Sequence, residues 1–276
     1  MKHINFYLIL LTICFCSCNK PQTSLVILHT NDTHSQVEPK SDGRGGYARR
    51  IGYINQERAI DKDLLLLDAG DFCQGTPYFN FYRGDVEVEA LNKMKYDAVT
   101  LGNHEFDYGV DGLARMLEKA EFPVVCANYD CSQSALKDIV KPYIIVKKKG
   151  LKIGIIGVGV QPESLIANDN FAPLVWQNPI PIVNQYADML KEEKHCDIVI
   201  ALSHLGTYPS HGDSKDGICD SSLAANSRNI DIIVGGHTHI VVENQYQNNL
   251  DGKPVLLCQT GKSGINVGKI IVQLEQ

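Results

Sequence analysis

Short apolar runs alternate with amphipathic segments along most of the chain. Leu25–Leu28 and Leu64–Leu67 are runs of four apolar residues, which is typical of buried strands. Between them, Tyr47, Ile51 and Ile54 recur at helical spacing and predict a helix. The same reasoning predicts helices at 47–58, 86–95, 110–120 and 182–194, and strands at 98–101, 123–127, 198–202 and 230–234. Alternating helices and strands indicate an α/β fold.

A group of strands closes the chain. Two apolar segments, 143–146 and 151–158, flank Lys147–Gly150, and the pattern predicts a hairpin with the lysines in a solvated turn. Further strands are expected at 254–258 and 265–272. Helices that alternate with strands early in the chain, followed by a run of strands at its end, favour two stacked sheets with helices outside, rather than one doubly wound sheet. We find no internal repeat or central linker, so a single domain is expected.

The N-terminus has the pattern of an export signal. An almost continuous apolar run covers residues 4–15, which is shorter than the roughly 20 residues needed to span a bilayer. It is followed by Ser17-Cys18, as in bacterial lipoproteins, where a small residue precedes a cysteine that becomes lipidated. We predict a signal peptide at 1–17, a lipid anchor at Cys18 and a linker at 18–23. The mature chain would face the periplasm or the exterior, anchored to a bacterial membrane.

The overall composition is that of an ordinary globular protein. Hydrophobic residues make up 44% of the 276 residues, charged residues 21%, and the formal net charge is −6. The sequence shows no basic cluster longer than the lysines at 147–149, so no nucleic-acid partner is expected. Six cysteines follow Cys18. The spacing of Cys126 and Cys131 allows a disulfide, whereas Cys196 and Cys258 lie in apolar stretches and are expected to be buried thiols.

Asp, Asn or His follows five of the predicted strands, often beside glycine. The segments are His29–His34, Asp68–Asp71, Gly102–Asp107, Ser203–Gly206 and Gly235–His239. A single Asp or His after a strand usually forms a turn or a cap. Sites in α/β folds, however, assemble at the C-terminal ends of strands. Five such segments in one chain therefore predict one common site.

The residue types and spacing in these segments suit metal ions. Asp32 and His34 are two residues apart, so an extended backbone would place both side chains on the same side. The same argument predicts that His237 and His239 share a face. Carboxylate, imidazole and amide ligands suit Zn, Mn, Fe or Co.

Taken together, the segments resemble the motifs of the calcineurin-like metallophosphoesterases. The chain carries, in that family's order, Asp32-x-His34, Gly70-Asp71, Gly102-Asn103-His104-Glu105, the lone His204 and Gly236-His237-x-His239. The fuller forms around Asp32 and Asn103 look like the 5′-nucleotidase branch. The resemblance implies a four-layer α/β/β/α sandwich formed by one domain at 24–276. It also implies metal-dependent hydrolysis of phosphate esters, with nucleotides as the expected substrates.

The resemblance further implies a role for each site residue. The implied ligands are Asp32, His34 and His239 for one divalent ion, Asn103, His204 and His237 for the other, and Asp71 as the bridge. Two ions about 3.5–4 Å apart clamp a phosphate and activate a bridging hydroxide for in-line attack. His104 would stabilise or protonate the leaving oxygen, with Asp107 orienting the imidazole.

Alternatives to this function stay open. The two-domain 5′-nucleotidases carry a second domain that stacks the base and holds the phosphate, and this chain ends after its final strands. We therefore expect either a separately encoded partner with that domain or action alone on a broader set of phosphate esters. Other hydrolases that fit are a 2′,3′-cyclic-nucleotide phosphodiesterase, a nucleotide-sugar hydrolase and a thiosulfate-ester hydrolase. The alternative of a different class is a non-catalytic metal- or nucleotide-binding subunit.

Overall fold

Two six-stranded sheets form the middle of the molecule in this computed structural model, which describes residues 24–208 and 217–273. The strands of the first sheet, in spatial order, are β14 (Gly268–Gln273), β1 (Ser24–Thr30), β2 (Leu65–Asp68), β3 (Ala98–Thr100), β4 (Val124–Val125) and β6 (Val140–Lys141). Those of the second are β12 (Val241–Asn248), β13 (Pro254–Thr260), β11 (Ile232–Val234), β10 (Ile198–Ser203), β8 (Leu151–Val158) and β7 (Tyr143–Lys148). A small ribbon pairs β5 (Tyr129–Asp130) with β9 (Val175–Trp176).

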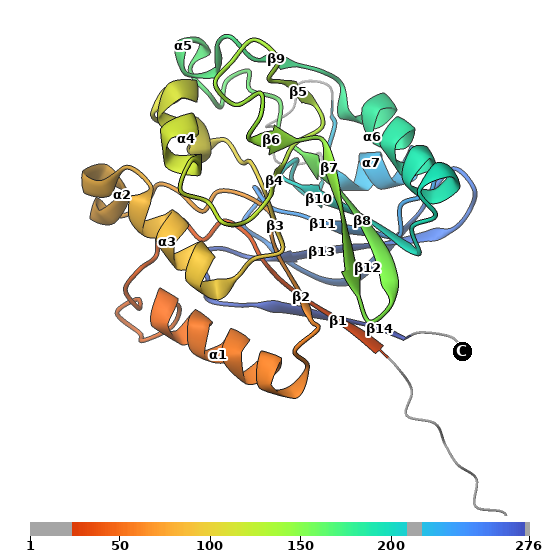
Figure 1. The fold of residues 1–276 in the computed structure, drawn as a ribbon, viewed down its shortest axis with the longest axis horizontal. Helices are drawn as coiled ribbons and strands as arrows, with labels where there is room; N and C mark the ends of the chain where they lie inside the picture. Colours follow the sequence, from red (N-terminus) through yellow and green to blue (C-terminus); the bar gives the residue numbers. More distant parts are fainter. Residues whose placement is uncertain (1–23, 209–216, 274–276) are drawn as a thin grey trace, which may run out of the picture.

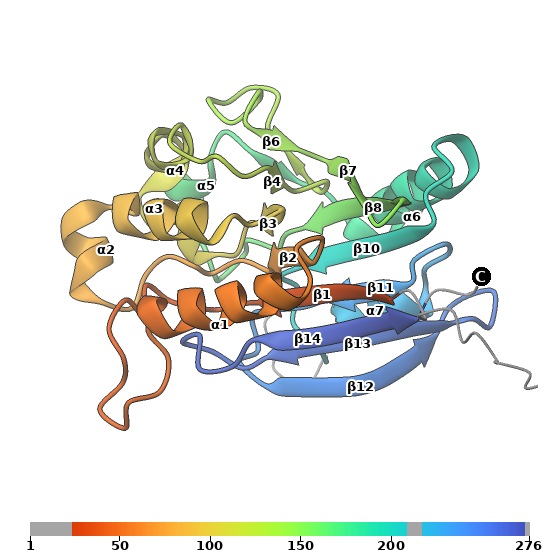
Figure 2. The ribbon, with the colours of Figure 1, turned by 60° about the horizontal axis from the view of Figure 1, so that its bottom comes forward.

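Most strands of each sheet run parallel, so their carboxyl ends lie on the same side of the sheet. β1, β2, β3, β4 and β6 run parallel, and only β14 is antiparallel in that sheet. In the second sheet β8, β10, β11 and β13 run parallel between the antiparallel edge strands β7 and β12. Figure 2 shows β14 beside β1 and β12 beside β13. The segments that follow the parallel strands therefore all leave a sheet on the same side, at the carboxyl ends of its strands.

Helices cover both outer faces. One group packs on the first sheet: α1 (Tyr47–Ile60), α3 (Asp85–Met94) and α4 (Gly109–Leu117). The other packs on the second sheet: α6 (Pro179–Asp188), its π-helical continuation η2 (Met189–Glu193), and α7 (Asp220–Ala225). Figure 1 shows α1 and α3 on the opposite side of the sheets from α6. The connections hold α2 (Pro77–Tyr82), η1 (His104–Phe106) and α5 (Asn168–Phe171). The predicted α/β/β/α sandwich is confirmed.

Three hydrophobic clusters fill the three interfaces between these four layers. In β2 and the residue before it, Leu64 and Leu66 pack under the helices of the first sheet, while Leu65 and Leu67 pack between the sheets. Successive strand residues point to opposite faces of a sheet. All four leucines are fully buried because both faces of β2 are covered. Burial of each contributes about 1.5–3 kcal/mol. A continuous apolar run is therefore what a strand covered on both faces requires.

The predicted hairpin forms, but its turn is shorter than expected. Lys147 and Lys148 belong to β7, and only Lys149 and Gly150 make the turn, both with positive φ. Nor are the lysines simply solvated. Lys148 pairs with Asp97 and Lys149 with Asp61, each at 2.7 Å. The prediction of a fully solvated lysine turn was wrong because these side chains reach acidic residues at the ends of neighbouring segments.

The cysteines of the described part are all free and buried. Cys126 Sγ lies 3.5 Å from Asn128 Oδ1, and Cys131 Sγ lies 3.5 Å from the carbonyl of Tyr129. The disulfide that their spacing allows is therefore not formed. Cys196 and Cys258 are buried thiols, as expected.

The predictions for the N-terminal segment lie outside the described residues: the signal peptide at 1–17, the lipid anchor at Cys18 and the linker at 18–23. Within residues 24–208 and 217–273, no helix combines the length and the apolar character needed to cross a bilayer.

Candidate metal centre

The predicted site residues meet where the parallel strands of the two sheets end. Asp32 and His34 follow β1, and the segments after the next two strands of that sheet carry Asp71, Asn103 and His104. On the second sheet, His204 follows β10, and His237 and His239 follow β11. Nitrogen and oxygen atoms from these segments form three groups, each with all its atoms within 4.8 Å of one another. The groups are Asp32, His34 and His239; His34, Asp71 and His104; and Asp71, His204 and His237.

Asp32 presents one carboxylate oxygen to this centre. Its Oδ2 accepts hydrogen bonds from Asn31 Nδ2 at 2.6 Å and from the backbone N–H of His237 at 2.9 Å. Its Oδ1 is buried and finds no donor among the described residues. The Nε2 atom of His239 lies 3.3 Å from that oxygen. A bound cation is the partner that would satisfy Oδ1, since an unpaired buried carboxylate oxygen is costly.

His34 and His239 point their ring nitrogens at each other. The two Nε2 atoms are 2.9 Å apart, and Nε2 of His34 is 3.9 Å from Oδ1 of Asp32. Three potential ligand atoms thus surround one point. This donor set fits a divalent transition metal.

Asp71 lies between the two outer groups. Its Oδ2 is 3.1 Å from Nε2 of His204, and its Oδ1 accepts the backbone N–H of His104 at 2.9 Å. The other ring nitrogen of His204 lies 2.6 Å from the carbonyl of Ala69, which fixes the orientation of the imidazole. Burial raises the pKa of Asp71, but the charge of His204 outweighs it and holds that pKa far below its usual range. The carboxylate is therefore ionised and able to bridge cations.

Asn103 supplies a neutral oxygen to the same region. The residue is 7% exposed, and its Oδ1 has no hydrogen-bond donor in the described part of the chain. Buried amide oxygens normally accept hydrogen bonds. Together with Oδ1 of Asp32, this oxygen shows that the residues present fit a cation.

His104 and Asp107 form a pair at the exposed side of the centre. Nδ1 of His104 lies 3.2 Å from both carboxylate oxygens of Asp107. Burial lowers the pKa of His104, but the Asp107 hydrogen bond and the charges of Asp71 and Asp107 outweigh it and raise that pKa to about 9. His104 is thus an imidazolium at neutral pH, suited to stabilise or protonate an oxyanion.

The backbone of the site is not extended, as the face-sharing argument assumed. Asp32, His34, Asp71, His237 and His239 all have positive φ, between 46° and 75°. The extended geometry from which we expected His237 and His239 to share a face is absent, and their imidazoles join different groups of ligand atoms. Left-handed backbone at non-glycine residues is strained and clusters at functional sites. The loops, rather than strand geometry, aim these ligands.

Asn31, Glu105 and Gln259 support the site, although the sequence pattern does not mark them as functional. Asn31 and Glu105 lie inside the quoted motifs, but the motifs imply functional roles only for the residues beside them. Glu105 is buried, and its carboxylate accepts the backbone N–H groups of Asp71, Gly102 and Cys73 at 2.6–3.1 Å. Gln259 lies in a strand outside every motif. Its contacts come from packing of distant segments, and local pattern carries no sign of them.

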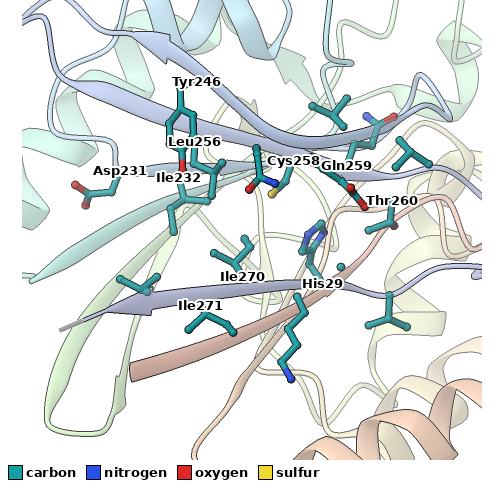
Figure 3. A pocket seen from close by; sticks show the side chains of 18 of the residues that line it. His29, Asp231, Ile232, Tyr246, Leu256, Cys258, Gln259, Thr260, Ile270 and Ile271 are labelled. Atoms are coloured by element: carbon teal, nitrogen blue, oxygen red, sulfur yellow. The ribbon is translucent and has the colours of Figure 1, made fainter. Parts of the chain in front are cut away.

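A cavity of about 650 Å³ lies away from the metal centre, between β12 and β13 on one side and β1 and β14 on the other. Figure 3 shows His29 projecting from β1 toward Cys258 and Thr260 of β13. Burial lowers the pKa of His29 to about 4, so the ring is neutral. The nine predicted site residues, all of them described, are not in the lining. The cavity is therefore distinct from the site.

The family model described as calcineurin-like phosphoesterase matches residues 25–241. Since that match covers most of the chain, this protein belongs to the calcineurin-like phosphoesterase family. The fold and the resemblance predicted from the motifs are both confirmed.

Similar proteins include several 5′-nucleotidases. The snake venom 5′-nucleotidase of Naja atra is 36% identical over 228 residues, covering 78% of this chain and 41% of that protein. The crystal structure of a 5′-nucleotidase precursor from Thermus thermophilus has a TM-score of 0.82 and 34% identity, covering 92% of this chain and 52% of the other. The crystal structure of the calcineurin-like phosphoesterase YfkN from Bacillus subtilis has a TM-score of 0.74 and 27% identity, covering 93% and 86%. The chain spans about two fifths of the length of the snake venom 5′-nucleotidases that it matches.

Proposed function

We propose that this chain is a metal-dependent phosphoester hydrolase that releases phosphate from nucleotides. The observation that carries the proposal is the set of three overlapping groups of ligand atoms, each within 4.8 Å, formed by segments from both sheets. Family membership supports the reaction class. The 5′-nucleotidases among the similar proteins support nucleotides as the substrate class.

Two divalent ions fit the donor set. We assign Asp32, His34 and His239 to one ion, Asn103, His204 and His237 to the other, and Asp71 to both. The first and third groups of ligand atoms support this division, and the unsatisfied oxygens of Asp32 and Asn103 support a cation at each end. When bound, such ions supply Lewis acidity toward a phosphoryl oxygen. The mixed carboxylate, imidazole and amide set suits Zn, Mn, Fe or Co.

His104 is assigned to the leaving group. Its imidazolium would donate a proton or a hydrogen bond to the leaving oxygen of the ester. Asp107 accepts from Nδ1, which fixes the ring and leaves Nε2 for the substrate. The side chain of His104 is 32% exposed, so a substrate can reach it. These two residues hold and move the proton while the candidate ligands stay in place.

A substrate panel tests the proposed function. We would load the purified chain with Mn or Zn and measure phosphate release from AMP, ATP, a 2′,3′-cyclic nucleotide, a nucleotide sugar and p-nitrophenyl phosphate. We expect metal-dependent release, fastest from a nucleotide and abolished in Asp71→Asn. Release from the cyclic nucleotide or the sugar alone would assign one of those activities instead. Two bound ions with no turnover of any substrate would indicate a binding subunit.

A partner protein is a further proposal. We infer that a separately encoded C-terminal nucleotidase domain joins this chain and completes substrate binding. Mixing the chain with such a domain should raise kcat/KM for nucleotides more than that for p-nitrophenyl phosphate. Unchanged values for every substrate would count against the partner.

Export and anchoring form a separate proposal, supported by the sequence of the first 18 residues. We propose that Cys18 carries lipid and holds the enzyme on the outside of the cytoplasmic or outer membrane. Expressed in a bacterium, the full chain should incorporate labelled palmitate and fractionate with membranes. In Cys18→Ala, both should be lost; label retained in that variant would exclude the anchor.

A further inference from the structure

Gln259 lies at the end of β13, beneath the loop that carries two of the candidate ligands. In the second sheet β13 lies between β11 and β12, so the loop joining those strands must cross the end of β13. That loop contains His237 and His239. Gln259 is 1% exposed, and Figure 3 labels it on β13 beside Thr260. A buried amide thus stands where the loop crosses.

This one side chain contacts the loop on both sides of the histidines. Its Nε2 donates to the carbonyl of Gly236, just before His237, and to Oγ1 of Thr207 at 3.3 Å. Its Oε1 accepts from the backbone N–H of Ile240, just after His239, at 2.9 Å, and from Oγ1 of Thr238 at 3.0 Å. Both ends and the middle of the loop are therefore tied to a single residue.

The loop needs such a constraint. His237 has φ of 75° and His239 has φ of 58°, both in the left-handed region that residues with a side chain avoid. Strained backbone persists only where the surroundings fix it firmly. The amide of Gln259 donates and accepts at once; glutamate at neutral pH cannot donate, and methionine does neither strongly.

We propose that Gln259 is a positioning residue for both metal ions, because it fixes one histidine from each ligand group. His239 belongs with Asp32 and His34, whereas His237 belongs with Asp71 and His204. The inference rests on the proposed metal-dependent function. Loss of the Gln259 contacts should release both imidazoles at once and weaken both ions.

Asn128 offers a matched control. It is fully buried, its Nδ2 donates to the carbonyl of Gly159 at 2.9 Å, and its Oδ1 accepts the N–H of Gly159 at 2.8 Å. It therefore also bridges a donor and an acceptor of one loop, but that loop carries none of the nine site residues. Asn128→Asp repeats the amide-to-carboxylate change of Gln259→Glu at a site that should affect only stability.

The test is a titration of the metal-free chain with Co²⁺, followed by its visible absorption, for wild type, Gln259→Glu, Gln259→Met and Asn128→Asp. Thermal unfolding in chelator identifies the variants that are folded at the assay temperature, and Gln259→Met serves if the buried carboxylate prevents folding. We expect the Kd of both ions to rise about 10–100-fold in the Gln259 variants, the usual cost of losing a partner behind the ligands. In Asn128→Asp both Kd values should stay within about twofold of wild type.

Two results would overturn the inference, and a third would instead contradict the proposed function on which it rests. Unchanged Kd values in folded Gln259 variants with lowered Tm would make Gln259 a stability residue only. Weakening of one ion alone would contradict its hold on both histidines. Wild type that binds fewer than two ions would instead contradict the proposed function, whatever the variants do.

Discussion

Nε2 of His204 lies 3.1 Å from Oδ2 of Asp71, and this contact joins the two sheets. Asp71 follows β2 of the first sheet and His204 follows β10 of the second. Burial lowers the pKa of His204, but the charges of Asp71 and Asp32 outweigh it and raise that pKa to about 10. In the metal-free protein a proton on His204 thus occupies the place that the proposed cation would take.

Metal affinity should therefore rise with pH. A ligating imidazole must be neutral, so binding releases the His204 proton wherever the metal-free site still holds it. Because the pKa of His204 is raised to about 10, His204 of the metal-free site is protonated throughout the range from pH 6 to pH 8. Calorimetric titration with Mn²⁺ in buffers of different ionisation enthalpy should show proton release and a lower Kd at pH 8. Equal Kd values at both pH values would show that the proton and the metal do not compete.

Removal of His104 should slow the reaction without removing metal. We expect kcat to fall about 10²–10⁴-fold in His104→Ala, the usual contribution of a general acid. The raised pKa of His104, about 9, keeps the imidazolium below that pH, so activity should fall as pH rises through it.

Asp107→Asn should move that alkaline limb to lower pH, because the carboxylate raises the pKa of His104. Pre-steady-state pH profiles on metal-loaded enzyme would check both variants. An alkaline limb at the same pH in Asp107→Asn would assign that limb to another group.

Gly236 should not tolerate a side chain. A Cβ there would lie 2.7 Å from Nδ1 of His204 and 2.8 Å from the carbonyl of Ala69. We expect Gly236→Ala to lose metal binding and about 1–3 kcal/mol of stability, as overpacking does. Gly52 in α1 has nothing within 4 Å of its Cβ position, so Gly52→Ala should gain up to about 1 kcal/mol. Urea denaturation of both variants measures these changes; equal effects would refute the steric argument.

Asp220 should make stability depend on pH. It is buried and accepts a hydrogen bond from Ser203 at 2.6 Å. Burial raises its pKa from 3.8 to about 7, although Ser203 and His204 act in the opposite direction. The folded state thus keeps a proton that the unfolded chain releases, and the free energy of unfolding falls as pH rises from about 4 to 7.

Asp220→Asn removes that titration while an amide oxygen can still accept from Ser203. Relative to wild type, the variant should gain stability between pH 4 and pH 8, by up to a few kcal/mol at about 1.4 kcal/mol per pKa unit. Urea unfolding in chelator at both pH values measures it. If the free energies of unfolding of variant and wild type differ by the same amount at pH 4 and pH 8, Asp220 ionises freely in the folded protein.

The sequence predicted the layers well because each interface leaves a local pattern. Leu64–Leu67 is apolar throughout because both faces of the strand are covered. The apolar residues of α1 recur at helical spacing because only one face of the helix packs against the sheet. β12 escaped prediction because it is an edge strand rich in polar residues, with the burial of only Val242 and part of Gln247 to mark it.

For the candidate site, the sequence predicted the residues but not their geometry. Asp32, Asp71 and His204 stand in recognisable segments at strand ends, and the structure brings them together. Their aim could not be predicted, because it depends on positive φ angles and on contacts between distant segments. The 230-residue separation between Asn31 and the Gly261 carbonyl that it contacts is one case, and Gln259 is another.

We propose above all that five strand ends form one centre for two ions. The most direct test is electron paramagnetic resonance of the chain titrated with Mn²⁺ to saturation, with Asp71→Asn beside it. Two ions per chain and an exchange-coupled spectrum are predicted, since ions sharing a bridging carboxylate lie about 3.5–4 Å apart; the coupling should vanish in Asp71→Asn. A single ion, or two with uncoupled spectra in the wild type, would contradict the account.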